Sequence, residues 1–162
     1  MKWKKYFILA VITLSLIISG SYGVNLKLKF LNSTAVAQSV NDREAEADRL
    51  FEQGNKQYRI SQFQQALQSW EQSLAIYREI ENRKSIADSL NNLGVAYNSL
   101  GDYRKAINYH QQSLEIAKQI GNRSGIAASL GNLGIAYGSL GDYRKAINYH
   151  QQSLVIAKQI GN

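Results

Sequence analysis

One segment of sixteen residues, Ser99–Leu114, returns without a change forty residues later as Ser139–Leu154. Repetition of this kind indicates a stack of similar units rather than one closed core, because every unit presents the same surfaces to its neighbours. A more divergent copy precedes these two, aligned on Gly54, Gly94 and Gly134 at a constant spacing of 40 residues. The repeat therefore limits the possible folds more than any other feature of the sequence.

Within each unit, apolar residues recur at the spacing of a helix. In the second unit Ile86, Leu90 and Leu93 would share one helical face. A second helix follows, with small, aromatic and aliphatic residues at fixed repeat positions: Ala66, Ala106 and Ala146; Phe63, Tyr103 and Tyr143; Leu74, Leu114 and Leu154. Small residues allow two helices to approach, and rings fill the space between them. The pattern predicts an all-α chain of paired helices.

The turns between the helices carry recognisable start and stop signals. Gly101 can take the left-handed conformation that closes one helix, and the side chain of Asp102 can cap the amides that open the next. In the first unit, Ser61 with Gln64 has the pattern of a capping box. We therefore expect a tight turn in the middle of every unit.

These positions carry a known signature. Leucine-glycine, tyrosine and alanine occur at Leu93-Gly94, Tyr97 and Ala106, and again at Leu133-Gly134, Tyr137 and Ala146. In this the chain resembles the tetratricopeptide repeat family over about residues 42–162. The forty-residue period most resembles the subtype of kinesin light chains and many bacterial scaffold proteins. Two departures are the missing proline near the end of the second helix and Gln53, which stands where leucine is expected.

The resemblance implies a right-handed solenoid of three helix-turn-helix repeats. The repeats would span residues 42–82, which are divergent, 83–122 and 123–162. Three units are about the minimum for a stable stack. Family members expose a groove lined mainly by the first helix of each pair.

The resemblance also indicates which side chains contact a ligand in that groove. By repeat position they are Asp48, Glu52, Asn55, Arg59, Asp88, Asn91, Asn92, Val95, Asn98, Asn132 and Ile135. An asparagine amide both donates and accepts, so it can hold the backbone of an extended peptide. The alternative is a solvated helix face without a ligand. The third unit has Gly131 and Gly138 in this region, which would allow a ligand backbone to approach closely, although recent duplication with drift explains the same difference.

Residues suited to catalysis are scarce. The two histidines, His110 and His150, occupy one repeat position that Trp70 fills in the first unit, which favours a packing role. No serine has a histidine and an acid at a recognisable spacing, and there is no cysteine. We predict a protein that is not an enzyme and that needs no metal ion or cofactor.

The formal net charge of +7 would suggest nucleic acid binding, but the charge is distributed unevenly along the chain. Five lysines lie before Gln38 without any acid among them, which leaves 14 basic and 12 acidic residues in the remainder. A nucleic acid binder normally has a basic stripe with interleaved aromatics on its folded part. The sequence therefore favours a protein or peptide partner and no nucleic acid.

Residues 1–37 differ in kind from the repeats. Lysines precede a continuous apolar run, and a small-residue cleavage site ends at Ala37, the pattern of an export signal. Residues 6–25 carry no charge and are about long enough to cross a bilayer, since roughly 20 residues are needed, so an uncleaved membrane anchor is the alternative. We expect an exported, extracytoplasmic protein, either soluble after cleavage or anchored.

The last helix has no polar capping helix after it in this sequence. An apolar edge that includes Ile156 and Ile160 should be exposed, which predicts self-association, a bound partner or a truncated gene. Together these features predict an interaction scaffold that holds a peptide or partner protein. The alternative is a fragment or accessory subunit of a larger cytoplasmic signalling or protease regulator that contains such repeats.

Overall fold

The computed structural model describes residues 36–161, so nearly all of the predicted signal or anchor lies outside the described residues. Within them the chain forms six helices and no strand. A helix over residues 36–59 is followed by α2 (Phe63–Glu79), α3 (Arg83–Ser99), α4 (Tyr103–Gln119), α5 (Arg123–Ser139) and α6 (Tyr143–Ile160). None of these described helices has both the length and the apolar character of a membrane span. The compact unit Arg43–Asn162 contains the repeats.

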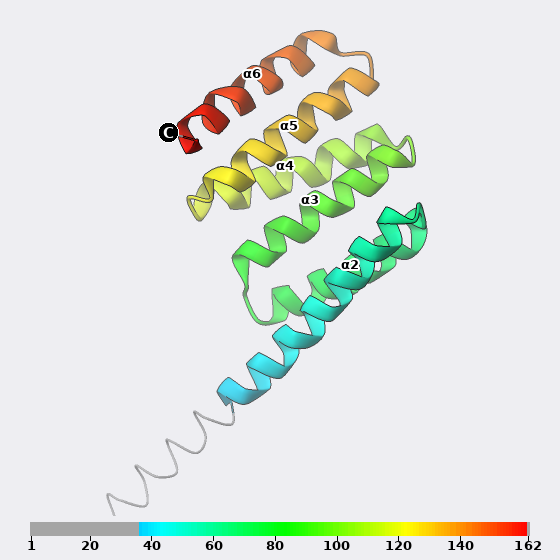
Figure 1. Ribbon diagram of the computed structural model, residues 1–162, viewed down its shortest axis with the longest axis vertical. Helices are drawn as coiled ribbons and strands as arrows, with labels where there is room; N and C mark the ends of the chain where they lie inside the picture. Colours follow the sequence, from blue (N-terminus) through cyan, green and yellow to red (C-terminus); the bar gives the residue numbers. More distant parts are fainter. Residues whose placement is uncertain (1–35, 162) are drawn as a thin grey trace, which may run out of the picture. The chain divides into compact units, whose positions relative to one another are not determined.

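Consecutive helices pack against one another from α2 to α6, as Figure 1 shows. The helices α3 and α5, which begin the second and third repeats, also touch each other. This succession of packed pairs matches the solenoid that the repeat pattern predicts. The all-α prediction is thus confirmed for the described residues.

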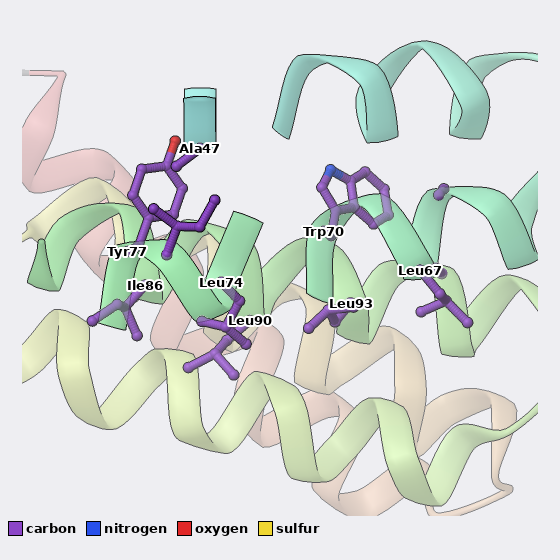
Figure 2. Packing of buried hydrophobic residues seen from close by; sticks show 11 residues of the cluster. Ala47, Leu67, Trp70, Leu74, Tyr77, Ile86, Leu90 and Leu93 are labelled. Carbon is purple, nitrogen blue, oxygen red and sulfur yellow. The ribbon is translucent and has the colours of Figure 1, made fainter. Parts of the chain in front are cut away.

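The apolar core forms two clusters along the stack. The first is built around Trp70, Leu74, Leu90 and Leu93 (Figure 2), and the second contains Leu130 with other residues of α4 and α5. These side chains are buried or nearly so, because the helical face of one repeat lies on that of the next. Burial of one such side chain stabilises the fold by about 1.5–3 kcal/mol.

A glycine on the first helix of each pair makes room for a ring on the second. A Cβ atom added at Gly54 would lie 2.5 Å from Nε1 of Trp70, and one added at Gly94 would lie 2.6 Å from Cε1 of His110. Real Cβ atoms do not approach other atoms so closely, so both positions need glycine. This contact explains why the repeats align on glycine.

The turns inside the second and third repeats follow the prediction. Gly101 has a φ of +80°, and the carboxylate of Asp102 accepts from the Lys105 amide at 3.1 Å. The predicted capping box of the first repeat is wrong. Ser61 has a φ of +60°, so it takes the left-handed place of Gly101, and α2 begins after Gln62 without a side-chain cap. Its backbone geometry is incompatible with the extended conformation of an N-cap.

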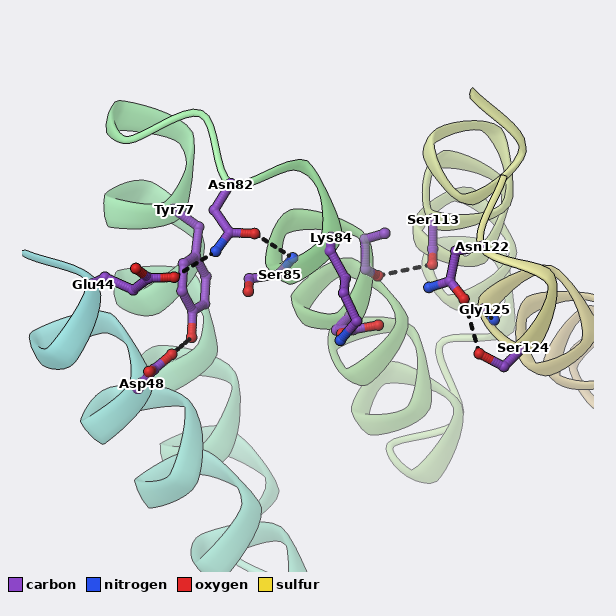
Figure 3. A network of polar contacts seen from close by, with 12 residues as sticks. Glu44, Asp48, Tyr77, Asn82, Lys84, Ser85, Ser113, Asn122, Ser124 and Gly125 are labelled. Atoms are coloured by element: carbon purple, nitrogen blue, oxygen red, sulfur yellow. Dashed lines mark hydrogen bonds and ion pairs between the residues drawn. The ribbon is translucent and has the colours of Figure 1, made fainter. Parts of the chain in front are cut away.

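A serine on each second helix fixes the pair internally. Its hydroxyl donates to a carbonyl of the first helix: Ser73 to Ala47 at 2.9 Å, Ser113 to Ala87 at 2.8 Å and Ser153 to Ala127 at 2.7 Å. Figure 3 includes the bond of Ser113. These bonds satisfy polar groups inside the stack and set the position of each second helix along the first.

Candidate functional site

The first-helix face contains a hollow of about 360 Å³ between the first and second repeats. Five of the predicted ligand-contacting residues line it, namely Glu52, Asn55, Arg59, Asn92 and Val95. Tyr58 and Trp70 complete the lining. The structure therefore brings together residues that lie up to 43 positions apart in the sequence.

Asn55 is the centre of the polar contacts in this hollow. Its side-chain oxygen accepts from Nε1 of Trp70 at 3.2 Å and from Nδ2 of Asn92 at 3.1 Å. Its own amide nitrogen donates to Glu52 at 3.1 Å, and Nε of Arg59 donates to its backbone carbonyl at 3.3 Å. The hollow thus has a polar floor whose side chains are held in place before any ligand arrives.

An equivalent contact set joins the second and third repeats. The side-chain oxygen of Asn91 lies 3.0 Å from Nδ2 of Asn132 and 3.0 Å from Nδ1 of His110. An amide oxygen only accepts, so the proton of the His110 ring is on Nδ1. Burial lowers the pKa of His110 to about 4, so the ring is neutral at pH 7.

In the second unit the histidine is a packing residue, as the alignment of the repeats predicts. His110 is 1% exposed and lies against Gly94. His150, at the same repeat position on α6, is exposed. The two histidines therefore have the same sequence neighbours and different surroundings.

Four of the predicted asparagines use their amides inside the chain. Asn55, Asn91, Asn92 and Asn132 bond to one another in pairs across the repeat boundaries. Their first role is to connect repeats, and a ligand would have to use the hydrogen-bonding capacity that remains. Asn98 differs, because its buried side-chain oxygen has no hydrogen-bond partner among the described residues.

Of the three predicted acidic residues, Glu52 lines the hollow, whereas Asp48 and Asp88 lie in two other places. The carboxylate of Asp48 accepts from the hydroxyl of Tyr77, which comes from α2 (Figure 3). Burial and this carboxylate raise the pKa of Tyr77 above its ordinary range. Asp88 is paired with Nζ of Lys84 at 3.1 Å on α3. Neither carboxylate lines the hollow around Asn55.

The third repeat offers a smaller and more apolar surface. Ile135 is 49% exposed where the hollow of the first repeat has Asn55. A Cβ atom at Gly131 would meet Oγ of Ser153 at 3.4 Å, and one at Gly138 would meet Ala146 at 3.7 Å, both ordinary contacts. Packing inside the chain therefore does not require glycine at either position, in contrast to Gly94.

Sequence reasoning missed two further hollows, which lie beside the second helices. Each has a volume of about 530 Å³, and both contain a lysine and a tyrosine from the same repeat positions. In the first, the rings of Tyr97 and Tyr109 stack at 5.3 Å, and Nζ of Lys105 lies 5.0 Å from the centre of the Tyr97 ring. An aromatic residue at helical spacing is ordinarily a core residue, whereas the structure leaves Tyr109 at the edge of an open hollow. The regular return of lysine and tyrosine at a forty-residue spacing was the available signal.

Within residues 36–161, no group of three or more His, Asp or Glu side chains is arranged to hold a metal ion. The polar contacts described above are hydrogen bonds among amides, hydroxyls and rings, together with bonds from single charged groups such as Glu52, Arg59 and Asp48. The arrangement can hold and orient a peptide through hydrogen bonds and apolar contact.

Comparison with known proteins agrees with this fold. The family model described as Tetratricopeptide repeat matches residues 54–119 and 85–159. The TPR domain of Arabidopsis FLU is 23% identical with a TM-score of 0.69, and the match covers 72% of this chain and 98% of that one. Aspartyl phosphate phosphatase F from Bacillus subtilis is 20% identical with a TM-score of 0.71, and the match covers 74% and 31% of the two chains.

A third similar structure contains a partner. The complex of the TPR2AB domain of yeast Sti1 with pHSP90 is 28% identical with a TM-score of 0.61, and the match covers 69% of this chain and 41% of that one. The chain thus spans less than half of the Sti1 and phosphatase chains that it resembles. No curated protein matches the sequence. Because the family model covers more than half of its length, the chain belongs to the tetratricopeptide repeat family.

Proposed function

We propose that the first-helix face holds a segment of a partner protein, and that the chain is a scaffold without enzymatic activity. The observation that carries this proposal is the hollow around Asn55, where five side chains of the predicted groove meet over a preformed network of amides. Repeats of this family typically mediate contacts between proteins. The Sti1 complex supports the same use of the fold, since that structure contains a bound partner.

The lining of the hollow indicates what kind of segment it accepts. Glu52 and Arg59 place charges of both signs at its edge, and Val95 supplies apolar surface, while the ring of Trp70 is 2% exposed and belongs to the core below. A polar side chain of the partner would enter here, with backbone groups of an extended segment along the amides. Further along the face, exposed Ile135 would contact an apolar residue of the same segment.

A site-specific cross-linking experiment tests the proposal. A photo-reactive amino acid at Val95 should capture a discrete partner, whereas the same group at Gln72, an exposed position on α2, should not. The captured segment, made as a synthetic peptide, should bind the purified chain. Arg59→Ala should weaken that binding about tenfold or more, as expected for loss of a hydrogen bond from a charged group.

Equal cross-linking from the photo-reactive group at Val95 and at Gln72 would contradict the proposal. Peptide binding that is unchanged by Arg59→Ala would also contradict it. Arg59 is exposed, so its replacement leaves the core intact. Unfolding curves of the variant and the parent should therefore coincide. This control separates lost binding from lost folding.

We also propose that residues 1–37 export or anchor the repeats. The support is the sequence of this segment, with lysines before an apolar run and a small-residue site at Ala37. Fractionation of cells that express the tagged full chain should place it outside the cytoplasm or in the membrane. A cytoplasmic chain would favour the second candidate, an accessory of a larger regulator, for which the fold similarity to phosphatase F is the supporting observation.

A further inference from the structure

The hollow lined by the end of α4 and the start of α6 contains positively charged side chains and no acid. We call it the α4–α6 hollow; it has a volume of about 530 Å³, and its polar lining consists of Lys118, Arg144, Lys145, Asn148, Tyr149 and Gln152. Lys118 lies in the last turn of α4, whereas Arg144 and Lys145 lie in the first turn of α6. A hollow lined by charges of one sign attracts ligands of the opposite sign.

Only part of this positive charge is balanced within the described residues. Oδ2 of Asp142 lies 3.0 Å from Nζ of Lys145. Neither Arg144 nor Lys118 forms an ion pair in the described part of the chain. Glu115, the one acid of α4, does not line the hollow. Three cations against the carboxylate of Asp142 therefore leave a net charge of +2 at this hollow.

The neutral side chains of the hollow add hydrogen-bond donors. Nε2 of Gln152 donates to Oδ1 of Asn148, which leaves Nδ2 of Asn148 to donate to another acceptor. The hydroxyl of Tyr149 can donate as well. A carboxylate only accepts hydrogen bonds, and a guanidinium such as that of Arg144 can hold it through two parallel bonds. The charges and the donors of the hollow thus both fit a carboxylate.

The equivalent hollow beside α2 and α4 provides a comparison inside the molecule. It has the same volume, and its two cations, Arg78 and Lys105, stand forty residues before Lys118 and Lys145. Its lining also includes Glu71, whose negative charge offsets one of them. At the repeat position of Glu71, α4 has the neutral Gln111. Of these two hollows, the α4–α6 hollow is therefore the better site for an anion.

The extent of the donors and the packing of the rings indicate the class of ligand. The donors run from Arg144 to Gln152, about 12 Å along α6, which is the length of about four residues of extended chain. A nucleic acid would require free rings on which its bases stack. The ring of Tyr149 is already stacked on that of Tyr137, with centres 5.4 Å apart. These features favour a protein segment that carries several acids.

We infer that the α4–α6 hollow binds an acidic segment of a partner protein, with carboxylates on Arg144 and Lys118. This site shares no lining residue with the hollow around Asn55. It is therefore independent of the peptide site proposed above, and either site can fail its test without affecting the other.

Binding of a model acidic peptide tests the inference. The probe is a fluorescent octapeptide of alternating glutamate and glycine, and its anisotropy is measured with the full chain in mild detergent at low salt. Arg144→Glu should weaken binding about tenfold or more, because attraction becomes repulsion. Arg104→Glu is the matched control: it makes the same charge change at the same repeat position of α4, and Arg104 lines neither hollow. Its effect should stay below about threefold, because salt screens distant charges.

Two further measurements separate binding from folding and from other anions. Arg144→Glu puts a negative charge in the first turn of α6, where the helix dipole favours it, so the variant should be at least as stable to urea as the parent. The lysines before Gln38 are present in every variant and contribute equally. A peptide with glutamine in place of glutamate should bind at least tenfold more weakly.

Three results would overturn the inference. The first is a parent chain that does not bind the acidic peptide, and the second is an equal loss of binding in Arg144→Glu and Arg104→Glu. The third is a single-stranded oligonucleotide of the same charge that binds more tightly than the peptide and also depends on Arg144, which would assign the hollow to nucleic acid.

Discussion

Asn132 donates a hydrogen bond from Nδ2 to Oδ1 of Asn91 at 3.0 Å, and the same oxygen accepts the Nδ1 proton of His110. This oxygen therefore joins the third repeat to both helices of the second. Trp70, Asn55 and Asn92 repeat the arrangement between the first and second repeats. The asparagines that the resemblance assigns to a ligand are also the polar connections of the stack.

Asn91→Ala should destabilise the chain more than Asn132→Ala does. Loss of Asn91 leaves the buried N–H of His110 without an acceptor, which costs about 1–3 kcal/mol, whereas loss of Asn132 removes one half-exposed bond worth about 0.5–1.5 kcal/mol. Urea unfolding of the two variants and the double variant measures both values. If the double variant loses as much unfolding free energy as the two single variants together, the hydrogen bond between Asn132 and Asn91 contributes nothing to stability.

The stability of the chain should fall as the pH is lowered from 6.5 to 4. His110 has an ordinary pKa of 6.5 and a pKa of about 4 when buried, so the unfolded chain binds the additional proton in this interval. Stability due to this group is complete above pH 6.5 and falls by on the order of 3 kcal/mol by pH 4. Unfolding curves collected at half-unit pH steps measure the effect.

The two histidines provide the control for this pH effect. His150→Gln changes the exposed copy of this repeat position and keeps the buried ring of His110, so the fall in stability that His110 causes between pH 6.5 and 4 should persist. His110→Gln should reduce the slope, although its stability at pH 7 is lower because the packed ring is lost. Equal slopes in both variants would assign the pH dependence to other groups.

Ser61→Gly and Glu81→Gly should each stabilise the protein. Ser61 has a φ of +60° and Glu81 a φ of +57°, the left-handed region that costs an ordinary residue about 1–2 kcal/mol. Glycine avoids this strain, and we expect a net gain of about 1 kcal/mol after the greater freedom of the unfolded chain is included. Thermal and urea unfolding check the gain.

Gly101→Ala is the reverse experiment, because Gly101 occupies the same repeat position as Ser61 with a φ of +80°. Apart from Gly101 itself and its two chain neighbours, no atom of the described residues lies within 4 Å of the added methyl group, so any loss of stability comes from the backbone. We expect a loss of about 1 kcal/mol. A neutral result would show that this turn relaxes and that the gain at Ser61 has another cause.

Gly94→Ala and Gly131→Ala should have opposite effects on stability. The first places a methyl group 2.6 Å from the buried ring of His110, and overpacking of this kind costs about 1–3 kcal/mol. The second meets only Oγ of Ser153 at 3.4 Å and should stabilise α5 by about 0.5–1 kcal/mol, because alanine is the better helix former. If Gly131→Ala also weakens partner binding, the open surface of the third repeat belongs to the binding face. If partner binding is unchanged, Gly131 is explained by sequence drift after the duplication.

Local patterns in the sequence are sufficient for the helices and for most turns. Gly101 with Asp102 predicts a left-handed residue followed by a cap, and the structure has both. The same reasoning fails at Ser61, because serine can cap a helix and can also be forced into the place of a glycine. Whether Ser61 caps the helix or takes the left-handed turn position depends on how the two helices of the repeat pack. The four residues around Ser61 do not determine that packing.

Repeat periodicity alone determines that the chain is a stack of helical pairs and that the first-helix positions share one face, because identical units must pack in the same way. It does not determine the surroundings of identical residues. His110 is buried and neutral whereas His150 is exposed, and Leu114 is covered whereas Leu154 is not. Only the tertiary structure decides this. Burial of a side chain depends on which helix packs against it, and the residues next to it in the sequence do not specify that helix.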